Sequence, residues 1–126
     1  MKKNKKGFTL IELIVTLAII AMLTVVLTPK LAGYITEAKK TQVLSQMRSV
    51  VIGAESYNVK ETANAIKDND KFADFKDALV TAGYLDDNTN SMIEAQQYSD
   101  IKDLVNGEKQ FSIVKGDDNT ESIEIQ

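Results

Sequence analysis

The strongest constraint on this chain is an uninterrupted apolar segment close to its N-terminus. Residues 8–28, FTLIELIVTLAIIAMLTVVLT, contain a single charged side chain, that of Glu12. A helix of this length spans about 30 Å, which is the thickness of the hydrocarbon core of a bilayer. The lysines that precede the segment would hold the N-terminus in the cytoplasm. The sequence therefore predicts a single-pass membrane helix rather than the buried core helix of a soluble domain.

An ordinary cleaved secretory signal peptide is an alternative interpretation of this segment. Such a peptide has an apolar stretch of about 7–15 residues, followed by an A-x-A-like cleavage site. Here the apolar stretch is longer and contains a carboxylate. The nearest small-residue sequence, residues 31–33, comes directly after Pro29 and Lys30. An anchored precursor explains these features better.

Glu12 is the residue of this segment that most needs an explanation. A carboxylate inside a transmembrane helix costs about 2.5–3.5 kcal/mol on insertion scales and usually has a partner. The segment contains no Lys or Arg. Cleavage before Phe8 would create an α-amino group one turn from Glu12 of the same chain, or close to Glu12 of a stacked neighbour. A carboxylate that only snorkels to the membrane surface is the structural alternative.

Pro29 is the only proline in the chain and follows directly after this segment. Its ring crowds the Val25 carbonyl, and it has no N–H to donate to that carbonyl. Several β-branched residues before it lower the helix propensity, and Gly33 follows one turn later. We therefore expect Pro29 and Gly33 to mark a kink and the part of the helix that melts most easily.

These features together resemble a known N-terminal signal. A lysine-rich leader, Gly7, the sequence Phe8-Thr9-Leu10-Ile11-Glu12, an apolar run and then a proline are similar to the class III signal peptide and N-terminal helix of type IV pilins. The resemblance implies that prepilin peptidase cleaves the Gly7–Phe8 bond and that Phe8 is N-methylated. It also implies that Phe8 and Glu12 act in subunit assembly, and that the helix melts around Pro29 and Gly33 on assembly. The family often has glycine where this chain has Ala21, which would make melting a little harder.

The same resemblance implies a structural function rather than an enzymatic one. The expected protein is a type IV pilus subunit, serving adhesion, biofilm formation, surface motility or DNA uptake. Its expected partners are other copies of itself, prepilin peptidase/N-methyltransferase, an assembly platform membrane protein, the assembly ATPase machinery and, before assembly, membrane lipid. Its expected location changes from a single-pass membrane precursor with a cytoplasmic N-terminus to an extracellular pilus on the cell surface.

Two other functions are compatible with the same N-terminal helix. A pseudopilin of a competence or type II secretion system would use it in a shorter fibre. A bitopic membrane sensor or anchor would leave the Gly7–Phe8 bond uncut. The absence of cysteine separates the chain from many Gram-negative pilins, whose C-terminal loop is closed by a disulfide, and makes it more similar to pilins of Gram-positive bacteria.

Composition limits the chemistry open to the rest of the chain. The 126 residues include no His, Cys or Trp, which excludes disulfides, thiol chemistry and histidine bases or ligands. Residues 61–126 carry six lysines against 15 acidic side chains, so direct nucleic acid binding is not expected. No catalytic residue, cofactor or metal is expected either.

An EF-hand-like spacing in the acidic region meets only part of what Ca²⁺ requires. Asp86, Asn88 and Asn90 fit the spacing, but Ser91 stands in place of the glycine and Gln97 in place of the bidentate glutamate. Solvated turns are the better interpretation.

The sequence after Pro29 predicts the head of an α+β fold. Residues 30–57 have the pattern of an amphipathic helix that continues the apolar one and packs under the head. A second helix is predicted over residues 71–82, with an N-cap among residues 68–70 and Gly83 at its C-terminal end. Residues 91–94 resemble a capping box, and residues 100–107 another short helical stretch.

The C-terminal region predicts an antiparallel β-hairpin. Residues 110–115 and 120–125 alternate apolar and polar side chains, and residues 116–119, Gly-Asp-Asp-Asn, favour a turn between them. A third strand within residues 92–106 is expected, because two strands alone are marginal. The predicted organisation is a cleaved leader (1–7), an apolar transmembrane and filament-core helix (8–29) and a soluble head domain (30–126), the last made of residues 30–57 and 58–126.

Overall fold

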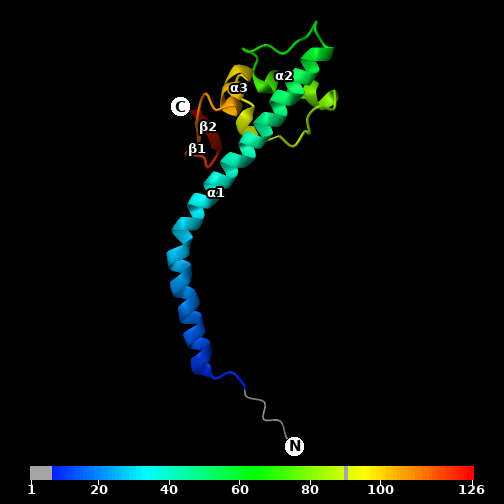
Figure 1. Cartoon of the computed structure of the whole chain (residues 1–126). Coiled ribbons are helices and arrows are strands. Elements are labelled where there is room, and N and C mark those ends of the chain that lie inside the picture. Colours follow the sequence, from blue (N-terminus) through cyan, green and yellow to red (C-terminus); the bar gives the residue numbers. More distant parts are fainter. Residues whose placement is uncertain (1–6, 90) are drawn as a thin grey trace, which may run out of the picture. The chain divides into compact units, whose positions relative to one another are not determined.

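The computed structural model describes residues 7–89 and 91–126 (Figure 1). Its elements are the helices α1 (Leu10–Lys60), α2 (Phe72–Thr81) and α3 (Tyr98–Asn106), the 3₁₀ turn η1 (Ser91–Ile93), and the strands β1 (Phe111–Lys115) and β2 (Glu121–Ile125). This combination confirms the predicted α+β fold. Residues 1–6 of the predicted leader lie outside the described residues.

The chain divides into two compact units, Met1–Glu37 and Ala38–Gln126, and α1 contributes to both. In the second unit, which we call the head, α1 buries one stripe of side chains at helical spacing: Val43, Met47, Val50 and Ala54. The core around this stripe contains Ile66, Phe72, Phe75, Leu79, Ile93, Tyr98, Ile101, Leu104 and Ile123. Every element of the head therefore contributes to one core. Helix α1 ends at Lys60, a little beyond the residue 57 expected from its apolar pattern.

Helix α2 begins where the sequence predicted, but its N-cap was predicted wrongly. Lys71 occupies the N-cap position and makes no side-chain capping bond. Asp70 closes a local turn instead, because its Oδ2 accepts the Lys67 N–H at 2.8 Å. The first α2 amides donate to another segment: Phe72 N–H bonds to the Gln96 carbonyl at 2.9 Å. Tertiary hydrogen bonds thus replace the expected side-chain cap.

The C-terminal end of α2 confirms the predicted role of Gly83 and forms a Schellman motif. Gly83 has φ +77°, a value that glycine adopts without strain. Its N–H donates to the Val80 carbonyl at 3.0 Å, and the Tyr84 N–H donates to the Leu79 carbonyl at 2.9 Å. The reversal brings the Tyr84 backbone against α1 at Gly53, where a Cβ would lie 3.3 Å from the Tyr84 carbonyl oxygen.

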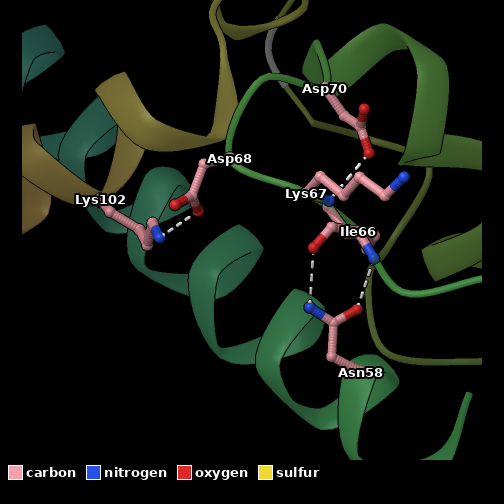
Figure 2. Close-up of polar contacts among 6 residues, drawn as sticks. All are labelled: Asn58, Ile66, Lys67, Asp68, Asp70 and Lys102. Atoms are coloured by element: carbon pink, nitrogen blue, oxygen red, sulfur yellow. Dashed lines mark hydrogen bonds and ion pairs between the residues drawn. The ribbon is translucent and has the colours of Figure 1, made fainter. Parts of the chain in front are cut away.

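The loop between α1 and α2 is fixed by polar side chains (Figure 2). The Asn58 amide pairs with both backbone groups of Ile66: its Nδ2 donates to the carbonyl at 3.0 Å, and its Oδ1 accepts the N–H at 2.7 Å. Asp68, farther along the loop, forms an ion pair with Lys102 of α3. The loop also caps α3, since the Ser99 N–H donates to the Asp68 carbonyl at 2.9 Å. These bonds hold Ile66 in the core.

Ion pairs link the remaining short elements. Lys76 of α2 donates to Glu94 Oε1 at 3.0 Å, and this hydrogen bond raises the pKa of the Lys76 ammonium. The Glu94 carboxylate therefore binds α2, and the capping box predicted for residues 91–94 is wrong; η1 is a 3₁₀ turn. Lys109 lies 2.8 Å from Asp100 and 3.0 Å from Asp103, and these bonds raise the pKa of Lys109. They connect the segment before β1 to α3.

The predicted hairpin is confirmed. Strands β1 and β2 pair antiparallel, with Ile113 opposite Ile123. The loop closes when the Asn119 N–H donates to the Gly116 carbonyl at 3.0 Å, and Asn119 itself has φ +70°. Ile123 is buried, whereas Ile125 is only half-buried.

The predicted third strand is wrong. Residues 92–106 form part of η1 and all of α3, and the sheet of the described residues has two strands. Tyr98, Ile101 and Leu104 are buried at a spacing of three residues, which is a helical and not a strand period. Gly107, with φ +80°, ends the helix.

The two helical glycines of α1 offer a matched test of head packing. We expect Gly53→Val to destabilise the head, because its side chain would collide with the Tyr84 backbone; overpacking of this kind typically costs about 1–3 kcal/mol. Gly33→Val is the control, since no heavy atom lies within 4 Å of its Cβ position. Thermal unfolding of the whole chain in detergent, followed by tyrosine near-ultraviolet circular dichroism, should show a lower Tm for Gly53→Val alone. Equal Tm values would contradict the described packing.

Candidate assembly site on the N-terminal helix

The first half of α1 exposes its apolar side chains on all sides. Every residue from Gly7 to Ala38 is exposed, and Phe8, Leu10 and Val25 retain 88%, 77% and 76% of their surface. Among the described residues, α1 is the one helix long and apolar enough to cross a membrane. Soluble monomers rarely expose contiguous apolar patches larger than a few hundred Å². This surface is therefore suited to lipid or to other apolar helices.

Hydroxyl groups within this surface are satisfied by the helix itself. Thr16 Oγ1 donates to the Glu12 carbonyl at 2.7 Å, Thr24 Oγ1 to the Ile20 carbonyl at 2.8 Å, and Thr28 Oγ1 to the Thr24 carbonyl at 2.6 Å. Polar groups that bond within their own helix can enter hydrocarbon at little cost. The polar chemistry of the segment is thus concentrated at its N-terminal end.

That end is closed by a capping box that the sequence reasoning missed. Thr9 precedes the first helical residue, Leu10, and its N–H donates to Glu12 Oε2 at 2.9 Å. The Glu12 N–H donates in return to Thr9 Oγ1 at 3.4 Å. The Thr-x-x-Glu pattern of residues 9–12 is the sequence signal of this cap. A carboxylate here is also favoured by the helix dipole.

The Gly7–Phe8 bond lies in non-helical backbone ahead of this cap (Figure 1). Gly7 and Phe8 are exposed, and no heavy atom lies within 4 Å of the Cβ position of Gly7. Phe8 and Glu12 line one shallow hollow of about 330 Å³ together with Ile11, Val15 and Thr16. The Gly7–Phe8 bond, which is predicted to be cut, is therefore exposed. Phe8 and Glu12 lie on the same surface.

Pro29 and Gly33 lie inside α1, whose helical backbone continues through both. Both are exposed, and the segment around them makes no buried contact. Unwinding there would break backbone hydrogen bonds without uncovering any packed side chain of this chain.

Among the described residues, no group of three or more potential metal ligands is found. Asn90 of the EF-hand-like spacing lies outside the part of the chain that the structure describes.

Residues 2–28 match the family model of the prokaryotic N-terminal methylation motif. The chain therefore falls in the class of proteins that carry this motif ahead of an apolar helix. Over 81 residues the chain is 36% identical to the type IV wide pilus major component PilA4 of Thermus thermophilus. This similarity covers 64% of the chain and 56% of that relative, so the chain spans little more than half of the relative's length. No solved structure matches the chain.

The chain is thus similar to a type IV pilus component in sequence and carries the N-terminal methylation motif, and its sequence is free of cysteine. The relative is named as a pilus component, which is a structural role. The apolar helix and the signal motif fit a membrane-anchored precursor and a surface pilus.

The capping box predicts a specific role for the Thr9 hydroxyl. We expect Thr9→Val to loosen the first turn of α1, because the Glu12 N–H loses its acceptor while the backbone bond from residue 9 to the carboxylate is kept. Thr16→Val is the control, since its hydroxyl donates to a carbonyl and supports no helix end. Amide exchange measured by NMR on the whole chain in micelles should become faster over residues 10–13 in Thr9→Val only. Unchanged exchange would show that the cap contributes nothing to the start of α1.

Proposed function

We propose that this chain is the precursor of a type IV pilus subunit, cleaved at the Gly7–Phe8 bond and polymerised through its apolar helix. One observation carries the proposal: residues 8–28 expose an apolar surface that nothing else in the described chain covers. Lipid would cover this surface before assembly and the helices of neighbouring subunits after it. The match to the methylation motif supports the processing step.

The lysine cluster of the leader supports an orientation in the membrane. Its four lysines would stay in the cytoplasm, and the head would be exported. Removal of the leader by prepilin peptidase, followed by methylation of Phe8, would leave an α-amino group as the only cation near Glu12. An assembly platform protein and an ATPase would then move the subunit from the membrane into the fibre.

Glu12 is proposed to set the register between subunits. Hydrophobic contacts cannot select a register within a bilayer, because lipid tails satisfy leucine and isoleucine equally well. A carboxylate and an α-amine that pair in hydrocarbon relieve two desolvation penalties together, whereas a mispaired register leaves one of them uncompensated. Only Oε2 of Glu12 accepts a hydrogen bond among the described residues, which leaves Oε1 for the Phe8 amine of a neighbour.

The relative favours a pilus over the pseudopilus that the sequence also allowed, because it is named as a major component of a wide pilus. We extend this to a surface filament that serves adhesion, biofilm formation, surface motility or DNA uptake. The acidic head would be displayed on the outside, where its charge keeps the filament soluble.

Processing can be tested at the cleavage bond. A side chain at position 7 is expected to block the peptidase, so Gly7→Val should accumulate as an uncut membrane precursor. Gly33→Val is the matched control and should be cut normally, because it lies within the helix and far along the chain from the bond. Intact-mass measurement of wild-type filaments should give a chain that begins at Phe8 and carries one added methyl group. Filaments whose subunits begin at Met1 would overturn the proposed processing.

The register role of Glu12 predicts a separation between insertion and assembly. Glu12→Ala should be inserted and cut normally yet form no fibres, and Glu12→Asp should assemble poorly because it is one methylene shorter. Each variant is expressed as the sole copy, and membrane and sheared-fibre fractions are compared by immunoblotting. Abundant fibres from Glu12→Ala would refute the register role. If the wild-type chain forms only short fibres that cannot be sheared from the cells, the pseudopilin is favoured instead.

A further inference from the structure

The stretch of α1 between Pro29 and the core of the head buries none of its side chains. Residues 30–38 are all exposed, and the first buried side chain along α1 is that of Val43. One turn before Val43, the half-buried Lys39 forms an ion pair with Glu121, the first residue of β2. Burial of α1 side chains by the head therefore begins at a defined point.

Residues 30–38 have little intrinsic helical stability. Isolated helices shorter than about 12–15 residues are marginal in water, and this stretch contains a glycine. Pro29 removes a backbone hydrogen bond at the start of the stretch. The continuity of α1 on both sides is what chiefly keeps these residues helical, so they are the cheapest part of α1 to unwind.

We propose that residues 30–38 are an extensible strap and that the Lys39–Glu121 ion pair is the stop at which its unwinding ends. A nine-residue stretch that changes from helix to extended chain lengthens by about 16 Å. This lengthening would let the head move relative to the apolar part of α1 without losing any buried contact. The use of this lengthening rests on the proposed filament function, whereas the stop itself is a property of the single chain.

The location of Glu121 explains why its ion pair with Lys39 would limit the unwinding of α1. Glu121 and Ile123 lie on the same face of β2, and Ile123 is inserted in the core. The carboxylate is therefore attached to an anchored strand and not to a loose segment. Unwinding that reaches Lys39 must first separate this ion pair, and the next turn would expose Val43. The cost of unwinding thus rises in two steps over a single helical turn.

Hydrogen exchange on the whole chain in micelles tests the stop. In the wild type, amides of residues 33–38 should exchange fast, and protection should begin between Lys39 and Val43. Glu121→Gln should speed exchange of the amides of residues 39–46 about two- to fivefold, the range expected for loss of an exposed ion pair. High salt should reproduce this effect in the wild type and add nothing in the variant.

Asp68→Asn is the matched control, because it breaks the Lys102 ion pair with the same change in net charge. It should leave exchange of residues 39–46 unchanged. Uniform protection from Lys30 to Met47 in the wild type, or equal rates in Glu121→Gln and the wild type, would overturn the proposal. The measurement needs neither cleavage nor polymerisation, so its failure would not bear on the proposed pilus function, nor would a failure to form fibres bear on the stop.

Discussion

The structure depends on one constraint: a helix with an apolar surface on all sides must satisfy every polar group by itself. Over residues 8–28 it satisfies many of them with few devices. Threonine hydroxyls bond to carbonyls one turn back, and a capping box between Thr9 and Glu12 satisfies donors at the helix start. One oxygen of the Glu12 carboxylate remains at one end of the apolar helix. A polymer built from such helices has few ways to choose a register, and the remaining polar atom is the natural one.

The head meets the opposite requirement with the same helix. Beyond Lys39, α1 is stable because its stripe from Val43 to Ala54 is buried under short elements that could not fold alone. Those elements hold each other through backbone groups: the loop after α1 caps α3, and the segment before α3 receives the first amide of α2. Asn58 of α1 fixes that loop at Ile66, and Asp68 connects it to Lys102 of α3. These connections hold the short elements around the common core.

The features that could be predicted from sequence are those determined locally. The apolar length, the Gly83 reversal, the helix before Gly107 and the Gly-Asp-Asp-Asn turn each follow from a few neighbouring residues, and all were found. The errors came from contacts distant in sequence. One of residues 68–70 was expected to cap α2, but the Gln96 carbonyl receives the first α2 amide. Glu94 was expected to complete a capping box, but Lys76 binds it. A third strand was inferred from the weakness of two, although η1 and α3 already cover the core.

At the assembly site the limitation was different. The charge of Glu12 suggests an ionic partner, whereas the structure shows a neutral one in the same chain, the Thr9 N–H. The two partners are compatible, because a carboxylate has two oxygens and the Thr9 N–H uses one. In the assembly that we propose, a cap formed before cleavage would fix the rotamer of Glu12, so less conformational entropy would be lost on pairing with the α-amine of a neighbour. The capping box and the proposed register pair would then be successive uses of one side chain.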